Sequence, residues 1–165
     1  HNPWALDGAA HVKEMCEYQF PLVSKRWVAQ GDLAGYHGYY GTPNPLGETP
    51  LVCFDLWRVR GDKIDEHWDA LMQVPDEANA EALTAGGRDG GADVATERIA
   101  GGRPLNVKNV IASGDLVVAH VHVEGEEPHV SWDVFRMVDG RIAEMWSVHQ
   151  PIAPPEEQAN THPHF

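Results

Sequence analysis

The chain has 165 residues, of which 42% are apolar and 22% are charged, as in an ordinary globular domain. Its formal net charge of −13 argues against nucleic acid and anionic membrane surfaces as partners, because both require a basic face. Two cysteines are too few for a disulfide scaffold, and no apolar run approaches the ~20 residues of a membrane-spanning helix. No signal peptide is visible, so we expect a cytoplasmic protein whose partner is a small molecule.

The first half of the chain predicts a helix, then strands, then a second helix. Val12, Met15, Cys16 and Phe20 recur at the spacing of one helical stripe. Segments rich in strand-forming residues follow at 24–30, 33–40, 51–60 and 63–72. Good helix propensity over 77–85 ends in a glycine-rich linker at 86–91.

The second half predicts the same order. A shorter helical stripe at 94–99 precedes strands over 107–112, 116–123, 132–138 and 141–149, and Asp139-Gly140 is a strong hairpin turn. The two halves also match in sequence. Phe-Asp-Leu-Trp-Arg-Val at 54–59 resembles Trp-Asp-Val-Phe-Arg-Met at 132–137, an offset of 78 residues. The chain is therefore interpreted as two repeats, 1–77 and 78–165.

The hairpin residues of both repeats resemble the SnoaL-like family of the nuclear-transport-factor-2-like superfamily. The resemblance rests on Asp-Leu-Trp-Arg at 55–58, Glu-His-Trp-Asp at 66–69 and Val-Pro at 74–75, with Asp-Val-Phe-Arg at 133–136 and Gln-Pro at 150–151 in the second repeat. It implies an α+β fold of two cone-shaped half-barrels, with curved antiparallel sheets packed on short helices around a pocket. Its members include polyketide cyclases, epoxide hydrolases, isomerases, dehydratases and non-catalytic binders.

Both repeats lack helices that the family has at the start of its domain. An isolated half would expose one apolar sheet face, which is unfavourable in a soluble monomer. We therefore expect either that the two halves pack face to face or that two chains form a homodimer.

Histidines and aspartates in the strands are the candidate catalytic residues. His120 and His122 share one strand face, as His37 and Tyr39 do in the first repeat; they line a cavity if the concave face is polar, and otherwise lie on the surface. Asp55 and Asp133 sit mid-strand between aromatic residues. Each is either a proton carrier with a pKa raised by desolvation or a structural anion bonded to backbone or to Arg58 or Arg136.

The last strand of the first repeat adds His67 and Asp69 on one face. By resemblance, epoxide hydrolases of the superfamily carry a working aspartate at the place of Asp69; alternatively, the two side chains simply pair. The second repeat has Met145 and Ser147 instead, so the two repeats cannot carry the same machinery. Aromatic and polar side chains are expected as pocket walls: Tyr39, Trp57, Trp68, Trp132, Phe135, Trp146 and His149.

These residues favour acid–base chemistry. We expect a lyase, isomerase or cyclase without an organic cofactor, in which a histidine or aspartate removes a proton next to a carbonyl. Histidines at 1, 162 and 164 and the His-x-His at 120 and 122 raise a metal possibility, but no compact ligand set accompanies them, and no metal site is predicted. The alternatives are a non-catalytic module that binds an apolar ligand and a domain that only dimerises.

Overall fold

The computed structural model describes residues 21–44, 46–89 and 105–158. The first meander comprises β1 (Leu22–Gln30), β2 (Leu33–Tyr40), β3 (Leu51–Arg60) and β4 (Lys63–Gln73). Helix α2 (Glu77–Ala85) and the short β5 (Arg88–Asp89) follow. The second meander comprises β6 (Leu105–Ser113), β7 (Leu116–Val123), β8 (His129–Val138) and β9 (Arg141–Pro151), and a 3-10 turn, η1 (Pro155–Glu157), comes last.

The described part is mostly β, and the predicted α+β class is wrong. About 65% of it is strand and 10% is helix. The helix predicted at 77–85 is present as α2, whereas those predicted near 12–20 and 94–99 lie outside the described residues. The physical reason is that each sheet covers one apolar face with the other sheet, so this core does not need a layer of helices.

The two meanders have matching topology. Their orders are β1-β2-β3-β4 and β5-β9-β8-β7-β6, with every pair antiparallel. Asp55 of β3 pairs with Asp69 of β4, and Asp133 of β8 pairs with Ser147 of β9, which keeps the 78-residue offset. The register breaks also correspond, after Arg58 in one sheet and after Arg136 in the other. The boundary between residues 77 and 78 stays a prediction.

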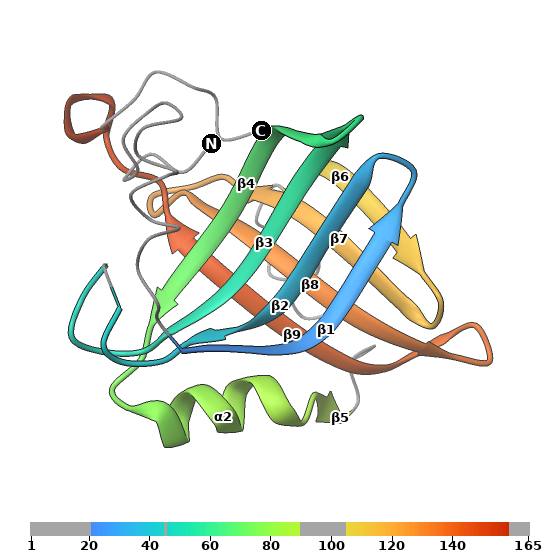
Figure 1. The fold of residues 1–165 in the computed structure, drawn as a ribbon, viewed down its shortest axis with the longest axis horizontal. Helices are drawn as coiled ribbons and strands as arrows, with labels where there is room; N and C mark the ends of the chain where they lie inside the picture. The colour runs from blue at the N-terminus through green and yellow to red at the C-terminus, as the bar shows by residue number, and fades with distance from the viewer. Residues whose placement is uncertain (1–20, 45, 90–104, 159–165) are drawn as a thin grey trace.

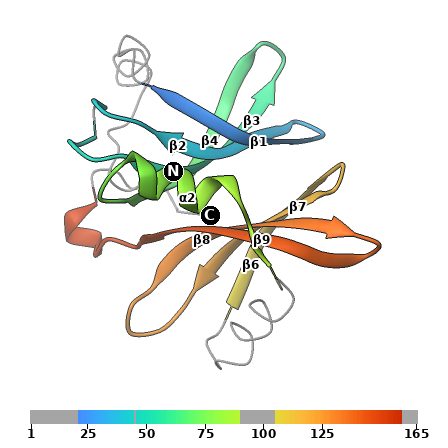
Figure 2. The ribbon, with the colours of Figure 1, turned by 90° about the horizontal axis from the view of Figure 1, so that it is seen from below.

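The sheets pack face to face as two layers (Figures 1 and 2), with one hydrophobic core between them. The rings of Phe54 and Trp132 stack across this interface with centroids 4.8 Å apart. Two glutamine side chains also join the sheets: Ala112 N donates to Gln30 Oε1 at 3.0 Å, and Leu71 N donates to Gln150 Oε1 at 2.9 Å. The two halves thus cover each other as expected; a second chain stays a prediction.

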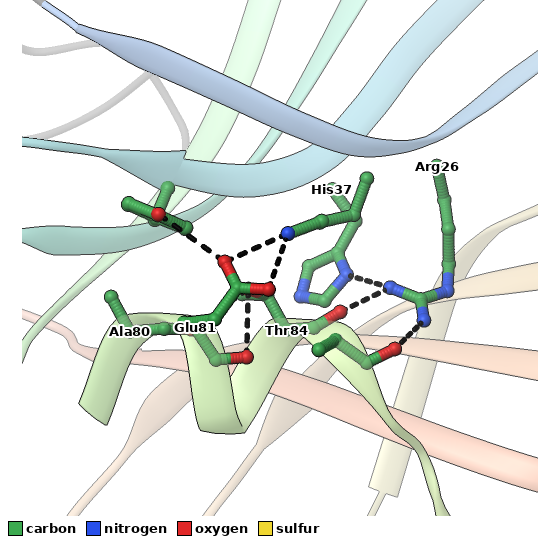
Figure 3. A network of polar contacts seen from close by, with 8 residues as sticks. Arg26, His37, Ala80, Glu81 and Thr84 are labelled. Carbon is green, nitrogen blue, oxygen red and sulfur yellow. Dashed lines mark hydrogen bonds and ion pairs between the residues drawn. The ribbon is translucent and has the colours of Figure 1, made fainter. Parts of the chain in front are cut away.

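Helix α2 lies at one end of the two layers and is held mainly by the first sheet (Figures 2 and 3). Asp76 caps its N-terminus by accepting from Asn79 N at 2.8 Å. Lys25 of β1 forms an ion pair with Glu81 at 2.7 Å, and Arg26 donates to the carbonyl oxygens of Thr84 and Ala85. Arg26 thereby satisfies two carbonyls that the helix leaves open at its C-terminus.

None of the helices in the described ranges is both long and apolar enough to span a membrane. Of the two cysteines, Cys53 is buried as a free thiol, and Cys16 lies outside the described residues.

Candidate functional site

Strand alternation divides the predicted site residues between two faces of each sheet. Phe54 and Leu56 of β3 belong to the core between the sheets, so Asp55 and Trp57 point to the opposite, outer face. On β4, Trp68 points inward, and its neighbours His67 and Asp69 point outward. The outer face of the first sheet therefore carries several of the predicted catalytic residues.

Five outward residues form what we call the Asp55 cluster: Tyr36, Tyr40, Asp55, His67 and Asp69. His67 Nε2 lies 2.9 Å from Asp55 Oδ1, and Tyr40 donates its hydroxyl to Asp55 Oδ2 at 2.9 Å. The Tyr36 hydroxyl in turn donates to that of Tyr40. One continuous chain of polar contacts thus runs from β2 through β3 to β4.

The sheet register brings these side chains together. Asp55 has Tyr36 as its partner on β2 and Asp69 as its partner on β4, so three outward side chains lie in one row across the sheet. Tyr40 follows Tyr36 by four residues and therefore points to the same face. Asp55 and Tyr36 are each only 2% exposed, whereas the His67 side chain is 37% exposed. His67 is thus the most exposed of these three side chains.

The pKa of His67 is set by opposing influences. Burial lowers it, but the hydrogen bond to Asp55 and the negative charges of Asp69 and Asp55 outweigh burial, so the net pKa is raised. Burial also raises the pKa of Tyr36 and of Tyr40, and the charge of Asp55 adds to both shifts. The two tyrosines therefore stay protonated and act as hydroxyl donors, and His67 binds a proton more readily than a free imidazole does.

Aromatic rings accompany this cluster along the sheet. The Trp57 ring stacks on His67 with centroids 5.3 Å apart and planes within 8°. Tyr36 contacts both Trp57 and Trp27, at centroid distances of 5.4 and 5.1 Å. This row crosses all four strands and ends at Trp27, which is 60% exposed on β1. Of the aromatic residues predicted as pocket walls, Trp57 is the one that contacts the Asp55 cluster, through His67 and Tyr36.

The outer face of the second sheet has a different arrangement. Asp133 Oδ1 accepts hydrogen bonds from Ser131 at 3.0 Å and from Ser147 at 2.7 Å. Ala119 pairs with Asp133 as Tyr36 pairs with Asp55, and Val123 follows Ala119 by four residues as Tyr40 follows Tyr36. Met145 corresponds to His67 by the offset of 78 residues. Asp133 is thus a buried carboxyl group that two serine hydroxyls contact. Phe135 and His149 share its face, and the His149 ring lies 5.9 Å from that of His129.

His37 and His120 lie between the sheets and not beside the aspartates. The His120 ring stacks on Trp132 with centroids 3.9 Å apart, while Asp133 points to the other face. Burial lowers the pKa of each histidine to about 3, with Arg26 contributing for His37 and Lys108 for His120. The expectation that these histidines share a cavity with Asp55 or Asp133 is therefore wrong.

Several other predicted residues are also core. Tyr39, Trp68, Trp132 and Trp146 belong to the hydrophobic core between the sheets, and His122 shares the inward face of β7 with His120. Burial of these large aromatic surfaces stabilises the sandwich. They are therefore structural residues and not walls of the Asp55 cluster.

The arginines expected as partners of the aspartates bind other carboxylates. Arg58 pairs with Asp32 at 2.9 Å and with Glu66 at 2.5 Å, and Arg136 contacts Asp115 and Glu144 in the same way. Asp55 is thus held by Tyr40 and His67. Tyr36 and Tyr40 were not identified as site residues from the sequence. The signal that could have found them is the pairing of the strands on either side of the 41–47 loop, which places Tyr36 opposite Asp55.

Searches against protein-family models, curated proteins and solved structures found no match. The likeness to SnoaL-like proteins stays an expectation from the sequence. The function must accordingly be inferred from the residues of the site itself.

The same cluster contains a set of potential metal ligands. Within the described ranges, Asp55, His67 and Asp69 can each offer one ligand atom, and these atoms lie within 4.8 Å of one another. The cluster can therefore be considered both as a proton-transfer site and as a place for a cation.

Proposed function

We propose that the Asp55 cluster is the reaction site of a small-molecule lyase, isomerase or cyclase that uses acid–base chemistry without an organic cofactor. The observation that carries the proposal is the Asp55–His67 contact of 2.9 Å in a chain that continues through Tyr40 to Tyr36. A histidine held by a buried carboxylate has a fixed orientation, and the carboxylate stabilises the imidazolium formed on proton uptake. His67 is the proton carrier, and Asp55 is its positioning residue.

Tyr40 and Tyr36 support this assignment. Their hydroxyls stay protonated, so they can donate to an anion without losing a proton themselves. Tyr40 uses this capacity to hold Asp55 in place. In the reaction that we propose, His67 takes a proton from a carbon next to a carbonyl and returns it at a second position. The positive charge of the imidazolium that His67 forms on taking the proton stabilises the oxyanion formed between these steps.

The second repeat supports the proposal by contrast. It keeps the aspartate, as Asp133, but has neither the histidine nor the tyrosines, and serine hydroxyls satisfy the carboxylate instead. In the same chain, two serine hydroxyls are thus enough to hold a buried aspartate that has only a structural role. The additional groups around Asp55 are therefore assigned to chemistry.

A test of this function uses proton exchange, because it needs no knowledge of the final product. The full chain is incubated in D2O with a panel of cyclic ketones, enones and 1,3-dicarbonyl compounds, and deuterium incorporation next to the carbonyl is followed by NMR. We expect faster incorporation with at least one carbon acid, and a loss of about 100-fold in His67→Ala. Incorporation that is equally fast in His67→Ala and the unaltered protein contradicts the proposal.

A second candidate is a non-catalytic module that binds a planar apolar ligand. The row of Trp27, Tyr36 and Trp57 favours it, since an exposed tryptophan continuous with buried rings offers a stacking surface. Saturation-transfer NMR with the same panel separates the two functions. Binding that is lost in Trp57→Ala, with no deuterium incorporation in any compound, supports the module over the enzyme.

A further inference from the structure

We infer that Asp55, His67 and Asp69 form a binding site for one divalent transition-metal cation, and that occupancy of this site inhibits the acid–base chemistry. The ligand atoms that these residues offer lie within 4.8 Å of one another, close enough to contact one ion. Two of them, His67 Nε2 and Asp55 Oδ1, are 2.9 Å apart. Ligand atoms ~2.1 Å from a tetrahedral zinc ion are separated by about 3.4 Å, so a movement of about half an ångström brings this pair to ligand distance.

The placement of the carboxylates is the physical reason for expecting a cation. Asp55 and Asp69 are direct partners on neighbouring strands and point to the same face. Like charges directly opposite each other destabilise a sheet, and Asp55 is almost completely buried, which increases their repulsion. A divalent cation bound between the two carboxylates compensates the charge of both.

The equivalent place in the second sheet contains no such opposition. Ser147 stands opposite Asp133, where the first sheet has Asp69 opposite Asp55. Met145 replaces the histidine. Because the second sheet holds serine at this position in the same backbone register, the fold does not require a carboxylate at Asp69 in the first sheet.

The donor set indicates the class of cation. One imidazole nitrogen and two carboxylate oxygens suit Zn²⁺, Co²⁺ or Mn²⁺, whereas Ca²⁺ and Mg²⁺ prefer sites made of oxygen alone. Three protein ligands leave further coordination positions for solvent or a small molecule. Of the two ligands in contact, His67 is the accessible one, with 37% of its side chain exposed.

Cation binding does not depend on the proposed function, but its inhibitory effect does. An imidazole that coordinates a cation cannot also carry a substrate proton, so the cation and the proton transfer exclude each other at His67. The two proposals can therefore fail separately. Zinc binding without any proton exchange leaves the cation site standing, and proton exchange without zinc binding leaves the acid–base function standing.

The test measures Zn²⁺ binding to the full chain by titration calorimetry after treatment with EDTA and dialysis. To separate this site from histidines near the chain ends, every protein carries His1→Ala, His162→Ala and His164→Ala. We expect one Zn²⁺ per chain. Asp69→Asn should lower the affinity for Zn²⁺ more than about 10-fold, because even the loss of a partner outside the ligand set costs about that much. Asp133→Asn is the matched control and should bind as the background protein does.

Asp69→Ser is a second variant, since the second sheet already holds serine at the equivalent place. Circular dichroism without metal verifies that each variant is folded. The inference is overturned if the background protein binds no Zn²⁺, or if Asp69→Asn, Asp69→Ser and His67→Ala all retain its affinity. If deuterium incorporation is observed, Zn²⁺ should suppress it in the background protein, and EDTA should restore it.

Discussion

The guanidinium carbon of Arg26 on β1 lies 3.4 Å from the ring centroid of Trp146 on β9, so one stacked pair joins the two sheets. The same guanidinium donates to the Thr84 and Ala85 carbonyls at 2.6 and 2.8 Å and lies 3.3 Å from His37 Nδ1 (Figure 3). Burial and the charge of Arg136 lower the pKa of Arg26 to about 10, with Glu144 opposing, so it stays charged at neutral pH. Arg26 thus connects both sheets and helix α2.

Replacing Arg26 by lysine should destabilise the protein. Lysine keeps the charge, but it cannot stack as a plane on Trp146 while donating to two carbonyls. We expect a loss of roughly 2 kcal/mol in the free energy of unfolding, measured by urea denaturation. Arg60→Lys, which alters an exposed ion pair with Asp65, is the control and should cost less than about 0.5 kcal/mol. Equal effects of the two substitutions would show that the stacked pair is unimportant.

Removing the hydroxyl of Ser147 should also destabilise the protein. Ser147→Ala takes away the shorter of the two hydrogen bonds to Asp133, which is only 6% exposed. A buried carboxylate that loses a donor costs on the order of 1 to 3 kcal/mol. Ser113→Ala, in the second sheet but distant in the register from Asp133, serves as the comparison in the same denaturation experiment. A cost for Ser147→Ala no larger than for Ser113→Ala would contradict the role of Asp133 as a structural anion.

Stability should fall as the pH decreases below about 6.5, because His37 and His120 are buried in the neutral form. Their folded-state pKa is about 3, so the unfolded chain binds protons there while the folded chain does not. The unfolding free energy therefore decreases by up to about 1.4 kcal/mol per pH unit for each histidine between about pH 6 and 4. Above pH 7 both states are neutral at these residues, and the effect is absent.

His120→Phe isolates this contribution. Phenylalanine keeps a ring to stack on Trp132 but cannot titrate. Denaturation midpoints measured from pH 7 to pH 4 should therefore decline less steeply in the variant than in the unaltered protein. Parallel declines would mean that His120 is protonated equally in both states.

The positions of the strands could be predicted from the sequence, but the faces of the strands could not. Strands predicted at 51–60 and 63–72 match β3 and β4 to within one residue, because the turn glycine at 61 has the positive φ that such a turn requires. In β3, however, all residues from Leu51 to Leu56 are buried, on both faces of the sheet. Polarity then no longer alternates with burial, so the sequence could not tell which face Asp55 shares with which histidine.

The candidate site shows the same limit. Its histidine and its two aspartates were predicted, and His67 was left as either a catalytic residue or a partner of Asp69. The structure pairs His67 with Asp55 on the neighbouring strand. Tyr36 and Tyr40 were not predicted, since a buried tyrosine in an apolar strand looks like core until the register places its hydroxyl. His37 and His120 face the core between the sheets and not the aspartates, which the sequence could not show because these strands are buried on both faces.

The most direct test of the acid–base account compares Asp55→Asn with Asp133→Asn in the deuterium-incorporation assay. The two aspartates occupy equivalent positions in sheets of matching topology, so each substitution is the structural control for the other. The account predicts that Asp55→Asn lowers the rate about 100-fold, because asparagine cannot stabilise the His67 imidazolium, while Asp133→Asn keeps the rate of the unaltered protein. Equal rates in the two folded variants, or a greater loss in Asp133→Asn, would contradict it.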